Sequence, residues 1–207
     1  MSQFAAIYAD PPWQFRVWSK PMKPIVGGHG GRSAEDYYNT MSTDELCRLP
    51  VSGLALPDCC LFLWVCWPTL PDALRLGTAW GFEYKTCAFV WVKQTGRGNG
   101  WHTGMGYWTR ANTEACLLFT RGNPKRQSKR VHQLIVEAGQ LSLFPPIVAP
   151  VGRHSAKPQE VYSRIESLVD GPYCELFARV QWPGWTALGN EIDGLDIQEA
   201  IQKYDVS

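Results

Sequence analysis

Four consecutive residues near the N-terminus, Asp10, Pro11, Pro12 and Trp13, combine an acid, two rigid carbonyl groups and a flat aromatic ring. They follow the apolar run FAAIYA at 4–9, which is typical of a buried strand. Neither proline has a backbone N–H for a sheet ladder, so the strand ends here and the acid lies at its carboxyl end. In an open α/β sheet, ligands bind at this edge.

Such a motif can activate an exocyclic amine of an aromatic ring. The lone pair of this amine is delocalised into the ring, which makes the amine a poor nucleophile. A carboxylate at Asp10 and the carbonyl of Pro11 can accept both amine hydrogens and free the lone pair, while Trp13 offers a face for stacking. The motif therefore predicts alkylation of an amino group on a nucleobase. The alternative is an ordinary turn with a core tryptophan.

The rest of the chain alternates strand and helix patterns. Near-continuous apolar runs predict further buried strands at 60–65, 87–92, 115–120 and 173–178. Helix signals follow the capping-box sequence 42–45 and lie within 68–81 and 157–171. This alternation predicts a single α/β domain with a mostly parallel sheet and helices on both faces. We expect segments 14–38 and 94–112 to be substrate or cofactor loops, and 196–207 to be a C-terminal tail.

Composition excludes several classes of protein. The chain has 207 residues and a formal net charge of +1, which argues against a strongly basic nucleic-acid coat. It has no signal segment and no apolar run long enough to cross a membrane, so we expect a cytoplasmic protein. Seven cysteines without a Cys-x-x-Cys pair predict reduced core thiols, and four scattered histidines give no zinc spacing. The signature of the zinc base deaminases is absent, and the glycine-rich segments lack a P-loop pattern.

The sequence resembles the N6-adenine methyltransferases of the MT-A-seventy type. Beside the motif 10–13, family blocks occur in family order over roughly residues 5–195: YYNTMSTDEL, CLFLWV, WGFEYKTCAFVWVK, TEACLLFTRGNP, GRHSAKPQEVYSRIESL, CELFAR and GWTALGNEIDG. The resemblance implies a Rossmann-like fold with a permuted motif order, in which the catalytic motif precedes the main cofactor-binding blocks. It also implies S-adenosyl-L-methionine (SAM) as methyl donor and no metal.

The resemblance also implies roles for particular residues. The catalytic motif corresponds to Asp10, Pro11, Pro12 and Trp13, and the implied cofactor-binding residues are Asp10, Lys157, Glu175, Arg179, Asn190 and Glu191. The expected substrate contacts are Trp13, Tyr38, Trp108, Lys157, Lys125 and Arg126. Trp101 and Tyr107 are further candidates for a base pocket, with packing as the alternative. The chain departs from the eukaryotic branch at Val180-Gln181, where relatives have Pro-His-Asn, and at Glu191, where they have Gln.

Lys125 and Arg126 belong to the segment RGNPKRQSKR at 121–130, which has five basic residues in ten. This density favours contact with phosphates, and a solvated loop is the alternative.

The reaction expected from these features is in-line transfer of a methyl group from SAM to the N6 amine of adenine in DNA. RNA is the nearest alternative substrate. A catalytically silent nucleic-acid-binding subunit is a second alternative, against which the intact motif and cofactor blocks argue. A tryptophan-rich sugar-binding module would explain ten tryptophans but not the motif after a strand. We expect a bacterial or phage protein that binds nucleic acid, has no membrane association and self-associates as a homodimer.

Overall fold

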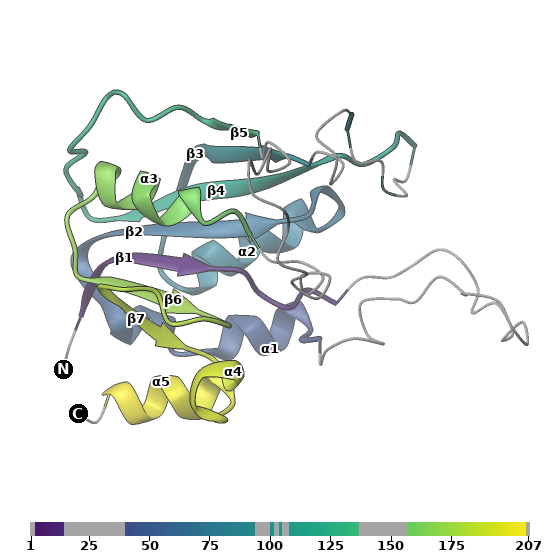
Figure 1. The fold of residues 1–207 in the computed structure, drawn as a ribbon. Helices are drawn as coiled ribbons and strands as arrows, with labels where there is room; N and C mark the ends of the chain where they lie inside the picture. The colour runs from purple at the N-terminus through teal and green to yellow at the C-terminus, as the bar shows by residue number, and fades with distance from the viewer. Residues whose placement is uncertain are drawn as a thin grey trace, which may run out of the picture.

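The computed structural model describes residues 3–14, 40–93, 100, 101, 104, 108–136 and 157–205. They form a seven-stranded sheet in the order β5-β3-β4-β2-β1-β6-β7 (Figure 1). The strands are β1 (Phe4–Ala9), β2 (Ala55–Val65), β3 (Glu83–Val92), β4 (Thr113–Arg121), β5 (Leu134–Val136), β6 (Tyr173–Leu176) and β7 (Trp185–Leu188). Of these described strands, only β4 runs antiparallel to its neighbours, so the predicted mostly parallel sheet is confirmed.

Helices cover both faces of the sheet. They are α1 (Thr43–Arg48), α2 (Leu70–Ala79), α3 (Glu160–Leu168), α4 (Asn190–Asp193) and α5 (Ile197–Asp205), with short 3-10 helices η2 (Val51–Leu54) and η3 (Trp67–Thr69). Leu46 of α1, Leu76 of α2 and Ile201 of α5 belong to one hydrophobic core. Val161 and Ile165 of α3 belong to the core on the other face, and Figure 1 shows α3 in front of the sheet and α2 behind it.

Local sequence signals account for the start of α1 and the ends of α2. The Ser42 hydroxyl accepts a hydrogen bond from the Glu45 N–H, and the Glu45 carboxylate accepts one from the Ser42 N–H at 2.8 Å, which is the predicted capping box. In α2, Pro71 lies in the first turn, and Gly81 follows the helix with a φ of 86°, which favours glycine.

Two parts of the architecture differ from the sequence-based expectation. Strands β5 and β7 were not predicted, because each is short and neither lies within a longer apolar run such as the one that indicated β6 at 173–178. Residues 196–207 do not form a loose tail over their described part. Ile197, Ala200 and Ile201 lie on one face of α5 and are buried in the core, because their spacing is helical.

The cysteines are unpaired, as the sequence predicts. All seven cysteines are free, and four of them are buried. In the part of the chain that the structure describes, no helix is both long and apolar enough to cross a membrane.

Candidate active site

The functional residues meet at the edge of the sheet where β1, β2 and β6 end, which we call the site edge. Asp10 follows β1 directly. Because β4 runs in the opposite direction, its first residues lie at this same edge, and its second residue is Glu114. Lys157 lies just before α3, and Lys93 follows the last residue of β3. Four segments distant in sequence therefore supply charged side chains to one place.

These four side chains form a row of alternating charge, which we call the charge row. Lys157 Nζ lies 2.6 Å from Asp10 Oδ2 and 3.3 Å from Glu114 Oε2, and Lys93 Nζ pairs with Glu114 Oε1. The Lys157 side chain is only 9% exposed. Burial of charge is costly unless opposite charges compensate it, so each member depends on its neighbours in the row.

The row sets the ionisation of its members. Burial raises the pKa of Asp10 above its ordinary value, and Lys157 only partly opposes this. Burial acts in the same direction on Glu114, but Lys157 and Lys93 together lower its pKa below the ordinary value. Burial tends to lower the pKa of Lys157, but the carboxylates of Asp10 and Glu114 raise it. Lys157 therefore stays protonated, and Asp10 is the more basic of the two carboxylates.

The motif 10–13 is held in one shape by backbone bonds. The Trp13 N–H donates to the Pro11 carbonyl at 2.8 Å, and the Met41 N–H donates to the Pro12 carbonyl at 2.9 Å. A carbonyl oxygen has two lone pairs, so Pro11 keeps one acceptor position. Among the described residues, the donor on the Asp10 carboxylate is Lys157, which occupies Oδ2 and leaves Oδ1. Two acceptor positions therefore remain side by side in sequence, at Asp10 and Pro11.

Trp13 fixes this motif to the core. Its side chain is 4% exposed, and its indole N–H donates to the Trp64 carbonyl at 3.0 Å. This placement gives the ring an anchoring role and leaves no open face of the kind expected for stacking. An aromatic residue that sequence analysis did not identify, Trp67, lies at the site edge two residues after the end of β2, is 47% exposed and donates to Thr113 Oγ1 at 2.9 Å.

Glu175 places a second carboxylate beside the motif. It lies on β6 opposite Tyr8 of β1, is 8% exposed, and accepts a hydrogen bond from the Tyr162 hydroxyl at 2.8 Å. Burial raises the pKa of Glu175 to about 7; the bond from Tyr162 opposes this, and the nearby negative charge of Asp10 adds to it. The site thus contains a buried carboxylate that titrates near neutral pH.

The turns after β6 and β7 lie against each other. A Cβ at Gly189 would lie 2.5 Å from the Ala178 carbonyl oxygen, so only glycine permits this approach. Phe177, at the start of the first turn, has a φ of 61°, which is uncommon for a residue with a side chain. As a result Arg179 Nε lies 3.7 Å from Glu191 Oε1, and Asn190 adjoins them at the start of α4.

The donor and acceptor set at this edge fits the chemistry of SAM. The partly buried carboxylate of Asp10 and the buried carboxylate of Glu175 suit a cationic sulfonium and ammonium group. The Glu191 carboxylate and the Asn190 amide can bond vicinal ribose hydroxyls, and the Arg179 guanidinium suits a carboxylate.

The remaining residues predicted from the sequence lie elsewhere. Lys125 and Arg126 are exposed in the connection that follows the last residue of β4, at the opposite edge of the sheet from Asp10, so the structure does not bring them to the site. Trp108 is 94% exposed and Trp101 is 53% exposed. Tyr38, Tyr107 and most of segments 14–38 and 94–112 lie outside the described residues.

Sequence analysis missed Glu114, Lys93 and Tyr162. A weak signal was present for the first two, because each is a charged residue directly flanking or inside a buried apolar strand, where charge is rare unless it is paired. Tyr162 carries no such signal, since a tyrosine on a helix is ordinary in sequence.

Comparison with known proteins gives a family match and several relatives. The MT-A70 family model matches residues 4–191. The chain is 32% identical to the type II methyltransferase M.MunI of Mycoplasma sp over 212 residues, which cover 97% of this chain and 82% of the relative. It is 31% identical to the N(6)-adenosine-methyltransferase catalytic subunit METTL3 of Homo sapiens over 202 residues, covering 95% of this chain. An N(6)-adenosine-methyltransferase MT-A70-like protein of Drosophila melanogaster is 32% identical over 202 residues.

The two kinds of relative differ in how much of their length is shared. The chain spans 30% of the human protein and 28% of the fly protein, in contrast to most of M.MunI. Since the family model covers the sequence from the first strand to the turn after β7, the chain belongs to the MT-A70 family, whose members are SAM-dependent N6-adenine methyltransferases.

Proposed function

We propose that this chain transfers the methyl group of SAM to the exocyclic N6 amine of adenine in DNA. The observation that carries the proposal is the state of Asp10, a partly buried carboxylate with one oxygen held by Lys157 and the other without a donor among the described residues. The choice of DNA is supported by similarity over 82% of the length of a type II methyltransferase, a designation used for DNA-modifying enzymes.

In the proposed reaction, Asp10 Oδ1 and the Pro11 carbonyl accept the two hydrogens of the adenine amine. This draws the nitrogen towards a tetrahedral geometry and frees its lone pair. When bound, SAM supplies an electrophilic methyl group; the N–C bond forms as the C–S bond breaks, and a neutral thioether leaves. The methylated ammonium then loses its proton to Asp10 or to water. Positioning and stabilisation of the developing ammonium charge supply most of the acceleration.

The rest of the charge row positions Asp10. Lys157 holds Oδ2, and Glu114 and Lys93 compensate the buried ammonium of Lys157. A carboxylate fixed in this way loses less freedom when it binds the amine, which is the advantage of a preorganised site. Glu175, Arg179, Asn190 and Glu191 would hold the cofactor, through its cationic, carboxylate and ribose groups.

The test uses methyl-labelled SAM with equal amounts of mixed-sequence duplex DNA, single-stranded DNA and RNA, for the wild type and Asp10→Asn. We expect N6-methyladenine in DNA, lost in the variant. Asn keeps the shape of Asp but removes the charge and replaces one acceptor oxygen by a donating amide group, so it tests the carboxylate as a whole.

The adenosine methyltransferases that match this chain at 31–32% identity support RNA as a second candidate substrate. Label in RNA alone would refute the DNA assignment and establish this alternative. Bound SAM with no label in any polymer would contradict the proposed activity and favour a silent subunit.

A further inference from the structure

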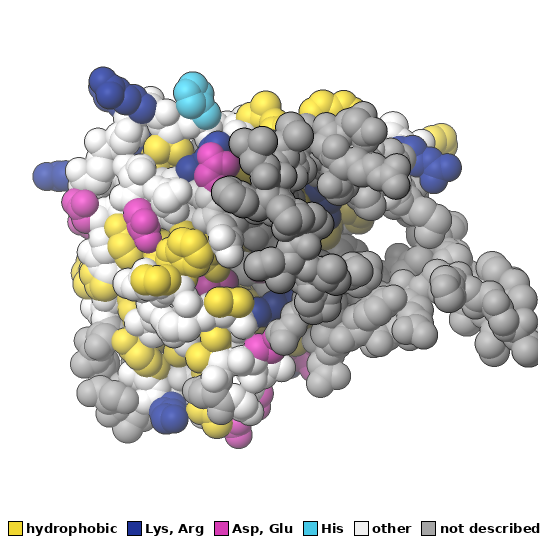
Figure 2. Space-filling view, in the orientation of Figure 1, with side chains coloured by type: hydrophobic (Ala, Val, Ile, Leu, Met, Phe, Trp, Pro, Cys, Tyr) yellow, Lys and Arg dark blue, Asp and Glu magenta, His cyan; other side chains and the backbone are white. Residues whose placement is uncertain are grey.

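The connection between β4 and β5, residues 122–133, carries a concentration of positive charge and is called the basic loop. Its four cations, Lys125, Arg126, Lys129 and Arg130, are all exposed. None of them forms an ion pair within the described part of the chain, whereas Arg75, Lys85 and Arg164 elsewhere on the surface do. Figure 2 shows Lys and Arg side chains projecting at the upper left of the molecule, beside a His. In a chain with a net charge of +1, this is an uneven distribution.

The basic loop is fixed to the body of the protein although it has no regular secondary structure. The Asn123 N–H donates to Asp58 Oδ1 at 2.8 Å. The Gln127 N–H donates to the Leu168 carbonyl at 2.9 Å, and the Gln127 side chain donates to Asp170 Oδ2 at 2.6 Å. The acids next to the loop thus bond its backbone and amide groups rather than its cations, which remain exposed.

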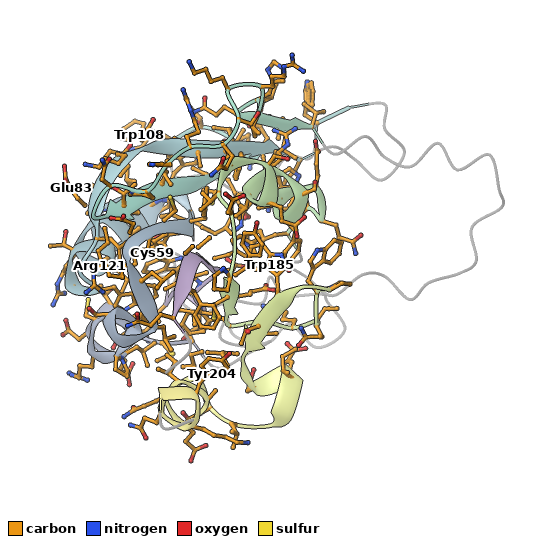
Figure 3. All side chains as sticks on the ribbon, turned by 90° about the vertical axis from the view of Figure 1, so that its left-hand side faces the viewer. Cys59, Glu83, Trp108, Arg121, Trp185 and Tyr204 are labelled. Carbon is orange, nitrogen blue, oxygen red and sulfur yellow. The ribbon has the colours of Figure 1, made fainter. Side chains whose placement is uncertain are left out.

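The basic loop begins far from the reacting groups. Strand β4 runs from Glu114 at the site edge to Arg121 at the opposite edge, and at about 3.3 Å per residue this span is about 23 Å. Figure 3 looks at the molecule from the left-hand side of Figure 1, with Arg121 labelled beside its strand partner Cys59. The loop then turns back, and Leu134 pairs with Val90 on the outer side of β3.

The chemistry of the basic loop favours a duplex phosphate backbone as the partner. Residues 122–133 contain no Phe, Tyr or Trp, the side chains on which unpaired bases stack. They also expose no large apolar side chain of the kind that forms the centre of a protein–protein interface. Cations alone suffice for phosphate contacts, which set the position and affinity of a protein on DNA.

From these observations we infer that the basic loop is a second DNA contact, which binds the phosphates of the duplex on one side of the target adenine. At about 3.4 Å per base pair, the 23 Å span corresponds to roughly seven base pairs. The inference rests on the proposed function, because it assumes that the target adenine lies in DNA at the site edge.

The test measures DNA affinity against salt concentration. The loop variant is Lys125→Gln, Arg126→Gln, Lys129→Gln and Arg130→Gln. The matched control removes the same charge elsewhere, by Arg48→Gln, Arg75→Gln, Lys85→Gln and Lys203→Gln. The probes are a duplex of about 30 base pairs and a hairpin of about 8 base pairs, each with a central mismatched adenine that is easily extruded. The hairpin leaves only about 14 Å of helix on each side, too little to reach the loop from the site.

On the long duplex, we expect the slope of log affinity against log salt concentration to be less negative for the loop variant than for the wild type. The difference should be about 3.6, which is about 0.9 for each of the four phosphate contacts removed. Between about 50 and 200 mM salt, the wild type should then lose about 150-fold more affinity than the variant. The control should keep the wild-type slope on both probes, and the hairpin should not distinguish the loop variant from the wild type. Thermal melting of both variants establishes that they are folded.

Equal slopes for the loop variant and the wild type on the long duplex would overturn the inference. If the loop variant loses as much salt dependence on the hairpin as on the long duplex, the placement of the loop contact away from the target adenine would be overturned. A third probe is single-stranded RNA of the same length as the long duplex, and a loss of salt dependence seen only with this RNA would overturn the commitment to duplex DNA. Methyl transfer assayed in the same samples separates the two proposals, because absence of N6-methyladenine in every polymer refutes the proposed function and leaves the salt slopes interpretable.

Discussion

Replacement of Glu175 by Gln should change how stability depends on pH. Glu175 is 8% exposed, and burial raises its pKa to about 7 from the ordinary value of 4.5. Gln has nearly the same shape, keeps an oxygen that can accept the Tyr162 hydrogen bond, and has no charge. The variant therefore removes the titration and little else.

The sign and size follow from linkage. A group whose pKa is higher in the folded state than in the unfolded state contributes stability at low pH, and that stability is lost as pH rises through the folded pKa. The difference between the ordinary pKa of 4.5 and the folded-state pKa of about 7 corresponds to roughly 3 kcal/mol of unfolding free energy. The wild type loses this stability progressively as the pH rises over that range. Glu175→Gln does not have this loss. The free energy of unfolding of the variant should therefore rise by about this amount, relative to that of the wild type, as the pH increases from acidic to mildly alkaline.

Urea unfolding of both proteins from about pH 5 to pH 8 measures this difference. The control is Glu83→Gln, because the Glu83 side chain is 78% exposed and its pair with Lys85 contributes little. A difference between Glu175→Gln and the wild type that stays constant over the range would refute the reasoning.

The same titration should govern SAM binding. Only the ionised form of Glu175 attracts a cation, and a pKa of about 7 means that the ionised fraction rises about tenfold between pH 6 and pH 8. Calorimetry should show SAM affinity rising by up to this factor in the wild type. If Glu175→Gln shows the same rise, Glu175 is not the group responsible.

Three further predictions concern the site. Asp10→Asn should lower the rate of methyl transfer by at least about 100-fold, as loss of one aimed electrostatic partner does, and near-normal turnover would overturn its role. The double variant Asn190→Ala with Glu191→Ala should weaken SAM binding in calorimetry, and unchanged affinity would refute the ribose contact. Lys157→Met should lower the unfolding free energy by about 3–5 kcal/mol, because it leaves the largely buried carboxylates of Asp10 and Glu114 without their shared cation; a loss below about 1 kcal/mol in urea unfolding would argue that the row is solvated.

Local signals in the sequence were sufficient for the motif and several helices. Two prolines after an apolar run must end a strand, so the place of Asp10 at a strand's carboxyl end follows from chain stereochemistry. The capping box at Ser42 is equally local. By contrast, whether a tryptophan is buried depends on what surrounds it, and nothing in residues 10–13 indicates that Trp13 donates to the Trp64 carbonyl.

The direction of β4 is the feature that the sequence did not reveal. A run such as ACLLFT, buried on both faces, has the same pattern whether the strand is parallel or antiparallel. Without its direction, Glu114 could not be assigned to the site edge, nor Lys125 and Arg126 to the opposite edge.

This one reversed strand connects the two proposals. Because β4 begins at the site edge, Glu114 can take part in the charge row and compensate the buried ammonium of Lys157. Because β4 ends at the opposite edge, the basic residues that follow it lie outside the reaction centre, where they do not disturb the pKa of Asp10. The strand thus separates a buried, charge-compensated site for chemistry from an exposed, uncompensated surface for phosphates. A nucleic-acid methyltransferase needs both. If the cluster of cations that binds the phosphate backbone lay beside Asp10, these cations would compete with the amine for the Asp10 carboxylate.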